Sequence, residues 1–302
     1  MNELFDKLIV RIFFTLTICL LIYLYKVGHA FIYPSSKRKL LKRIDPAKNP
    51  VDTIHFFSRL IGIGLIFSEF HFYMSEGMIF ALADFLIQAI LLFIIYLATI
   101  FIMESIVLYN FEYTDEISKR KSYPYAIISF AHSIGIAYTL KIVLAVARDS
   151  IPLIILLWLF AIVIIGFSVK CFNFFSKLSF NRLMIQKSLS IGLSYMGFFW
   201  GWVIMITSSL NHPVHNIKWY AVQTMLKLIL CLIIFPIFRM SIIRIYNIKQ
   251  DFVMSDKKVV DKDNEGPELG YGIYEGSLFL VCSYLTTVIT GHVHFGTFYP
   301  VY

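Results

Sequence analysis

Long apolar runs separated by short polar connections extend along the whole chain. There are eight such runs, at about residues 8–33, 53–74, 79–109, 124–147, 152–176, 185–208, 219–246 and 270–291. Each has the roughly 20 residues that a helix needs to cross a hydrocarbon core about 30 Å thick. The runs lack the alternation of a barrel strand, and a bilayer offers no water to open backbone groups. We therefore predict an all-α, polytopic membrane bundle of eight transmembrane helices.

The composition agrees with this prediction and excludes several other classes. Hydrophobic residues make up 58% of the chain and charged residues only 15%, whereas soluble domains have about 45–50% and 25%. Four cysteines without a C-x-x-C pair exclude a disulfide scaffold and zinc fingers. The net charge of +8 is accompanied by no nucleic-acid-binding motif, so we expect no nucleic-acid partner. The acidic start, MNELFD, does not resemble a cleavable signal, and we expect the first helix to be retained.

The basic residues are concentrated in alternate connections. The odd-numbered connections carry fifteen: Lys37, Arg38, Lys39, Lys42, Arg43, Lys48, Lys119, Arg120, Lys121, Lys177, Arg182, Lys249, Lys257, Lys258 and Lys262. The even-numbered connections carry Arg148 and Lys218. The positive-inside rule places the odd connections in the cytoplasm and both termini outside it. The basic loop Lys37–Lys48 is either a plain topology signal or also a contact for anionic headgroups.

The eight helices are predicted to form four hairpins whose returning helices repeat. With Asn49, Ser122 and Met184 as equivalent positions, glycine follows thirteen residues later at Gly62, Gly135 and Gly197. The fourth copy, aligned at Glu268, has Gly276 where the third copy has Gly192. Small residues on one face let membrane helices approach closely. We therefore expect these faces to be helix–helix contacts.

This pattern on the returning helices resembles the YjfL-like bacterial inner-membrane family, the domain of unknown function 350. That family opens each returning helix with Asn-x-Ala-Ala; here Asn49 keeps the asparagine, and none of the four copies keeps both alanines. The resemblance implies two tandem four-helix units, residues 1–150 and 151–302. It also implies a multi-pass protein of the bacterial inner membrane, linked to envelope maintenance, with no assigned catalytic residues.

Several ionisable residues lie inside the predicted spans, where charge is costly. Five fall roughly 8–12 Å from the helix ends on the basic side: Arg59, Glu104, His132, Arg239 and Glu275. We predict that Glu104 and Glu275 neutralise Arg59 and Arg239 between the helices. Arginines that extend to the headgroups without a partner are the alternative. Glu69 and Lys141 are a second possible pair, nearer the opposite face.

Histidines at the predicted outer ends are candidate metal ligands. They are His71, His212, His215, His292 and His294. Imidazoles suit a transition metal when about three converge, but short connections also carry histidine as an interfacial residue. His29, His55 and His132 lie in the inner half, where packing histidines are expected rather than haem ligands. We expect no resident cofactor.

These observations favour a protein without enzymatic activity of its own. Nucleophile elbows, phosphate-binding loops, dinucleotide fingerprints and H-E-x-x-H are absent from the sequence. The expected role is structural or partner-recruiting, with lipid and other membrane or cytoplasmic proteins as partners. A transporter or channel for an ion or small polar solute is the alternative. A metal-dependent membrane enzyme is the third hypothesis.

Overall fold

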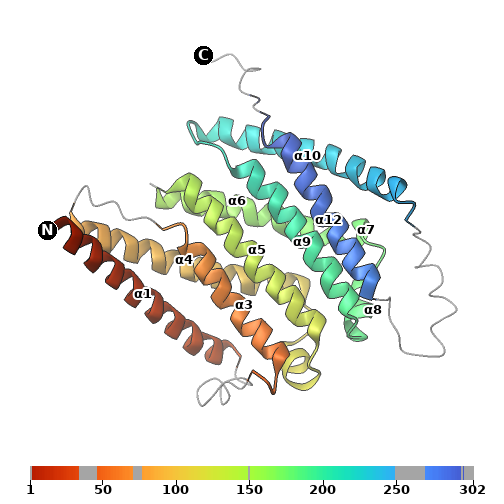
Figure 1. The fold of residues 1–302 in the computed structure, drawn as a ribbon, viewed down its shortest axis with the longest axis horizontal. Coiled ribbons are helices and arrows are strands. Elements are labelled where there is room, and N and C mark those ends of the chain that lie inside the picture. The colour runs from red at the N-terminus through yellow and green to blue at the C-terminus, as the bar shows by residue number, and fades with distance from the viewer. Residues whose placement is uncertain are drawn as a thin grey trace.

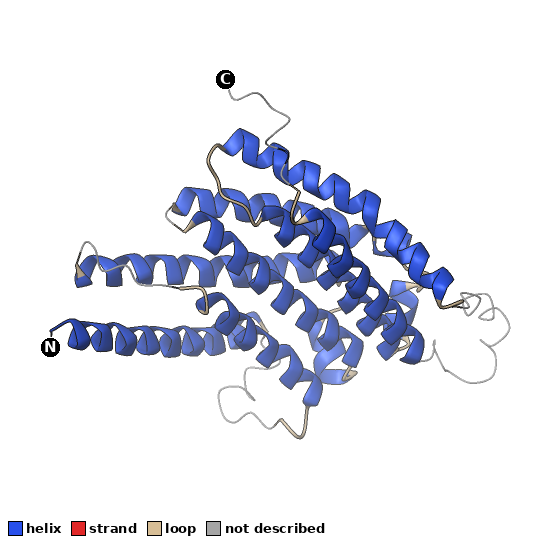
Figure 2. Cartoon of the chain, turned by 45° about the horizontal axis from the view of Figure 1, so that its top comes forward, coloured by secondary structure: helices blue, strands red, loops and turns tan. Residues whose placement is uncertain are grey.

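The computed structural model describes residues 2–33, 46–70, 77–148, 150–248, 269–293 and 295. Eight long helices account for most of them: α1 (Asn2–Ile32), α3 (Pro50–Phe67), α4 (Met78–Val107), α5 (Tyr123–Ala147), α6 (Ile151–Lys170), α9 (Leu189–Leu210), α10 (Ile217–Ile245) and α12 (Leu269–Thr290). All eight contain stretches long and apolar enough to cross a membrane. Within the described residues the secondary structure is helical throughout (Figure 2). The predicted fold class is confirmed.

Local sequence signals explain where several helices begin. Asn49 caps α3 by accepting a hydrogen bond from the backbone of Asp52 at 3.3 Å, and Pro50 follows at the first helical position. Ser150 caps α6 in the same way through the backbone of Leu153. A capping side chain satisfies a backbone N–H that has no partner within the helix. A proline in the first turn removes an N–H that would otherwise need one.

One apolar run does not form a single helix. The run 152–176 divides into α6 and the short α7 (Phe172–Phe175), and α8 (Phe180–Ile185) follows before α9 begins. At this point Phe172 packs against the rings of Phe180 and Phe198. A second unpredicted element is η1 (Thr114–Lys119), a π-helical turn between α4 and α5.

The four returning helices lie side by side in one row. In Figure 1, α3, α5, α9 and α12 run in the same direction, and neighbours in this row make the most extensive contacts of the bundle. Helices α1, α4 and α6 pack in sequence along the row, and α10 covers α9 and α12. The described connections that carry the odd-loop basic residues lie at one end of the bundle, which we call the loop end. The start of α1 and the end of α12 lie at the opposite end.

Glycine contacts hold α9 and α12 close together. A Cβ atom added to Gly197 would lie 2.1 Å from the carbonyl oxygen of Gly276. One added to Gly272 would lie 2.3 Å from the carbonyl oxygen of Ser190. Since backbone cannot move aside as a flexible side chain can, only glycine permits this approach. The small residues of the repeat therefore do form a helix–helix contact.

The structure corrects the register of the third repeat by one helical turn. Met184 lies in α8, and the residue that precedes α9, as Asn49 precedes α3 and Ser122 precedes α5, is Ser188. The glycine thirteen residues later is then Gly201, not Gly197. The sequence could not show this, because the short α8 merges with the apolar run that follows it.

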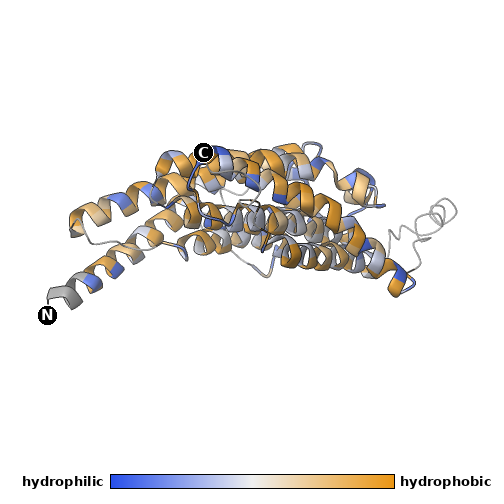
Figure 3. Cartoon of the chain, turned by 90° about the horizontal axis from the view of Figure 1, so that it is seen from above, coloured by the Kyte–Doolittle hydropathy of each residue, from blue (hydrophilic) through white to orange (hydrophobic). Residues whose placement is uncertain are grey.

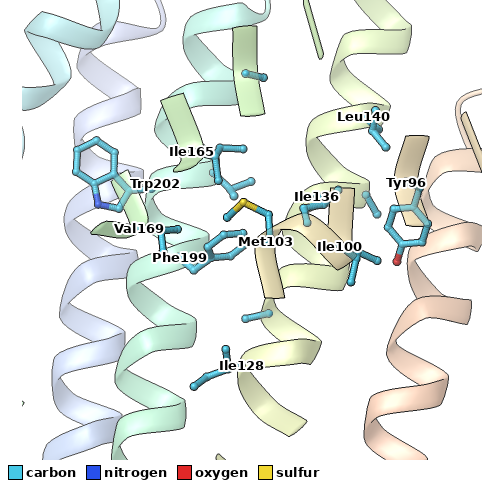
Figure 4. Close-up of a cluster of buried hydrophobic side chains, with 14 of the residues drawn as sticks. Tyr96, Ile100, Met103, Ile128, Ile136, Leu140, Ile165, Val169, Phe199 and Trp202 are labelled. Atoms are coloured by element: carbon cyan, nitrogen blue, oxygen red, sulfur yellow. The ribbon is translucent and has the colours of Figure 1, made fainter. Parts of the chain in front are cut away.

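The core lies between the row of α3, α5, α9 and α12 and the helices that pack along it. The outer faces of the bundle are apolar. Figure 4 shows Tyr96, Met103, Ile136, Phe199 and other side chains of α4, α5, α6 and α9 meeting there. Helices α5 and α9 are largely buried, whereas α1 and α10 expose most of their surface. That exposed surface is predominantly hydrophobic (Figure 3). Apolar groups on the outside of a bundle are expected when lipid is the solvent.

Candidate functional site

A buried ion pair joins α3 to α4 near the loop end. The Nη2 atom of Arg59 lies 2.9 Å from both carboxylate oxygens of Glu104. The residues are only 3% and 6% exposed. Each charge would be costly alone in this setting, so the two stabilise each other in the bundle.

Neutral donors complete the surroundings of the Glu104 carboxylate. Ser129 on α5 donates to Oε1, and Tyr33, just after α1, donates to Oε2 at 3.3 Å. The second guanidinium arm of Arg59 donates to the carbonyl oxygen of His55 at 2.7 Å. Burial, followed by the nearby carboxylate, raises the pKa of Tyr33, so its hydroxyl remains a donor at physiological pH. One carboxylate thus connects α3, α4, α5 and the end of α1.

Aromatic rings enclose this carboxylate on one side. The ring of His55 is fully buried, its Nε2 atom is 3.9 Å from Glu104, and its centroid is 4.8 Å from that of Tyr113. The ring centroids of Tyr33 and Tyr125 lie 5.5 and 6.2 Å from the centroid of His55. Among the described residues, neither nitrogen of His55 has a hydrogen-bond partner. The arrangement concentrates polar groups in a small aromatic enclosure.

An open pocket of about 380 Å³ reaches Glu104 from the loop end. Its lining comes from the last turn of α4, the segment before η1, the start of α5 and Tyr33. Glu104 therefore has its ion pair on one side and this pocket on another. We call the ion pair, its neutral donors and the aromatic enclosure the first-unit site.

The second half of the chain buries its carboxylate differently. Glu275 on α12 is 2% exposed and accepts hydrogen bonds from the hydroxyls of Ser176 and Ser194. Arg239 on α10 donates to the carbonyl oxygen of Phe175 at 2.7 Å and lies over the ring of Phe279 at 5.1 Å. Glu275 is therefore held by serine hydroxyls, and Arg239 by a backbone carbonyl and an aromatic ring, rather than by each other.

The five ionisable residues predicted to form one layer therefore lie in separate sites. Arg59 and Glu104 meet, whereas Arg239 and Glu275 are not joined by an ion pair, contrary to our expectation. The physical reason is the turn after α6, which presents the carbonyl of Phe175 to Arg239 and the hydroxyl of Ser176 to Glu275. His132 bonds the hydroxyl of Tyr195 at 2.8 Å, across the contact between α5 and α9.

The second predicted pair involves a third residue. The ammonium of Lys141 is 3.9 Å from Glu69, and Arg148 is closer to the same carboxylate at 3.1 Å. Lys141 also donates to the hydroxyl of Ser68. All these groups are partly exposed at the end of the bundle opposite the loop end, so the cluster resembles an interfacial charge network.

The histidines predicted as metal ligands do not form a metal site within the described residues. His71 and His294 lie outside the described residues. His212 stacks on Tyr220 at 4.3 Å, and its Nδ1 atom is 3.0 Å from the carbonyl oxygen of Ser209. Within the described part of the chain, three or more histidine, cysteine or acidic residues do not gather as a metal site would require.

Sequence reasoning missed several residues of the first-unit site. Tyr33 and Tyr113 lie in connections and Tyr125 begins a span, positions that suggest an interfacial belt rather than a site. Outside this site, sequence reasoning also missed Lys227 of the second half of the chain, which is buried in α10 one turn before Cys231. A search for every lysine within the apolar runs would have found it.

Eight membrane-length helices with apolar outer faces and buried charges define a multi-pass helical membrane protein. The chain belongs to the family described as Domain of Unknown Function (DUF350), whose model matches residues 3–144 and again residues 146–289. The two matches confirm the predicted family and its two tandem units. No curated protein and no solved structure matches the chain.

Proposed function

We propose that this protein is a non-catalytic component of the bacterial inner membrane that organises or recruits other proteins for envelope maintenance. The observation that carries the proposal is the fully partnered carboxylate of Glu104. Its donors come from different elements: Arg59, Ser129 and Tyr33. A buried charge whose hydrogen bonds are satisfied in this way rigidifies the bundle and fixes the relative positions of its helices.

The loop end is the surface proposed for partners. Arg120 beside η1 donates to the carbonyl oxygen of Ile185 in α8, and Lys187 donates to the carbonyl oxygen of Arg120. These bonds tie the connections of the two units into one polar face. With the basic connections in the cytoplasm, this face is available to cytoplasmic proteins, and the loop Lys37–Lys48 to anionic headgroups.

A reporter fusion tests this orientation. A reporter active only in the cytoplasm, fused after Tyr302, is expected to stay silent, and the same reporter inserted between Asn247 and Leu269 is expected to be active. A bright signal from the fusion after Tyr302 would invert the topology and remove the loop end from the cytoplasm.

Replacement of the ion pair tests the proposed role directly. The double variant Arg59→Met with Glu104→Met removes both charges and keeps apolar volume, and such replacements of buried pairs are often tolerated. We expect this variant to accumulate in the membrane and to restore envelope-stress resistance to cells lacking the protein. A variant that accumulates normally and fails to restore resistance would contradict the scaffold proposal, because the charges themselves would then be needed.

Passage of an ion or small polar solute is the second candidate function. One observation favours it: the pocket at the loop end reaches Glu104. Under this alternative, reconstituted vesicles would show a flux that the Met–Met variant abolishes, whereas the scaffold proposal predicts equal leakage from vesicles with the original and the variant protein.

A further inference from the structure

The pocket beside Glu104 has an unusual lining. Ten residues line it, among them Tyr33, Glu104, Tyr109, Glu112, Tyr113 and Tyr125. Four of these ten residues are tyrosines and two are glutamates, and none is a lysine, arginine or histidine. Its volume of about 380 Å³ lies in the range of small-ligand pockets.

Two of the tyrosine hydroxyls donate their protons to carboxylates. Tyr33 donates to Glu104, and Tyr113 donates to Asp52 at 2.7 Å. These hydroxyls offer the pocket oxygen lone pairs rather than donors, and the tyrosine rings contribute aromatic carbon to the lining. Such a lining repels an anion and attracts a cation.

The charged groups around the pocket also favour a cation over an anion. Arg59 balances Glu104, while Glu112 is exposed at the pocket edge and Asp52 lies behind Tyr113. Within the described residues no three candidate metal ligands converge, so the lining does not suit a hard metal ion. Aromatic rings with peripheral carboxylates suit a larger, weakly hydrated cation instead.

We propose that this pocket binds a small alkylammonium cation. The site is independent of the scaffold function proposed above, since neither requires the other. Tyr109 already shows the chemistry: the ammonium of Lys170 lies 5.9 Å from the centre of its ring, on the side of a neighbouring hollow. The cation has two sources, a free solute at the loop end or a lipid headgroup, because Phe101 in the lining is 55% exposed on the outer surface of α4.

Calorimetry with the full-length protein tests binding of the free ion. Tetramethylammonium chloride is titrated into protein purified in a maltoside detergent, with sodium chloride as the blank. Glu112→Gln is expected to weaken binding about fivefold through the lost charge. Tyr109→Ala is expected to weaken it about threefold to fivefold, and Tyr109→Phe to leave it unchanged, because the ring face is retained.

Two exposed residues away from the pocket provide matched controls. Asp84→Asn removes a carboxylate from the opposite end of α4, and Tyr284→Ala removes an exposed ring from α12. Both variants should bind as the original protein does. Lys170→Met, which removes the cation already beside Tyr109, should strengthen binding about twofold.

Native mass spectrometry tests the lipid source. Protein from nanodiscs of mixed phosphatidylcholine and phosphatidylglycerol is expected to retain phosphatidylcholine, and Tyr109→Ala to lose it, if the headgroup is the occupant. Saturable binding of tetramethylammonium without lipid retention would assign the free solute. No saturable heat together with no preference for the choline headgroup would overturn the proposal. Binding by Glu112→Gln and Tyr109→Ala as tight as that of the original protein would also overturn it.

Discussion

The two units use the same fold to bury a carboxylate and stabilise it by different means. In the first unit, Glu104 on the third helix faces Arg59 on the second. In the second unit, Glu275 on the fourth helix is held by two serine hydroxyls, and Arg239 on the third helix bonds a backbone carbonyl. The fold therefore does not dictate an ion pair; it dictates a polar layer that each unit fills with its own residues.

The helix contacts differ in a complementary way. In the second unit, α9 and α12 meet backbone to backbone at Gly197 and Gly276. In the first, the position equivalent to Gly197 in the corrected register is Ser58, whose hydroxyl donates to that of Ser133 on α5 at 3.2 Å, so side chains lie between the two backbones. The comparison suggests that charge holds the first unit together and close packing the second.

Breaking the ion pair should have the largest effect. Glu104→Gln leaves the guanidinium of Arg59 buried without its counter-charge, which costs about 3–5 kcal/mol. Thermal unfolding in detergent measures the loss. The Met–Met double variant should be destabilised much less than the single change; additive losses would mean that the two charges do not interact.

Closing the glycine contact should rank second. Gly197→Ala places a methyl group against the backbone of Gly276, and overpacking of this kind costs about 1–3 kcal/mol. Gly64→Ala is the control, because no atom of the described residues lies within 4 Å of a Cβ atom there. An equal melting temperature for the two variants would contradict the proposed close packing of α9 and α12.

Neutralising the second carboxylate should cost less than neutralising the first. Glu275→Gln keeps an acceptor for Ser176 and Ser194 and strands no opposite charge, so we expect a loss of about 1–2 kcal/mol in the same unfolding assay. A loss as large as that of Glu104→Gln would show that Arg239 depends on Glu275 after all, and the contrast between the units would disappear.

Removing Lys141 should have the smallest effect. Its ammonium is 3.9 Å from Glu69, and Arg148 remains at 3.1 Å. Lys141→Met should therefore cost under about 1 kcal/mol, as expected of a solvent-accessible pair. A larger loss would place this cluster in a drier environment than its partial exposure indicates.

The sequence predicted the spans and much of the first-unit site. Hydropathy found all eight helices, and helix spacing put Arg59 and Glu104 at similar depth. It could not predict the break after Lys170, because Phe172 and its neighbours are as apolar as the helix before them. That break determines the partners of Arg239 and Glu275, which explains why their pairing was predicted wrongly.

The aromatic enclosure was harder to predict for a different reason. Tyr33 and Tyr113 come from connections separated by eighty residues and converge only in the fold. Periodicity describes positions within one helix and carries no information about residues that meet from outside it.

The contact between α5 and α9 joins the two units of the chain. There His132 bonds Tyr195, and Gly135 admits the ring of Phe199 so closely that a Cβ atom would lie 2.5 Å away. A chain with one unit alone would leave this face of α5 uncovered. Joining the two units in one chain therefore covers this face within the same molecule. Because the contact joins the fourth helix of one unit to the second helix of the next, it is head-to-tail and not the self-complementary contact of a two-fold dimer.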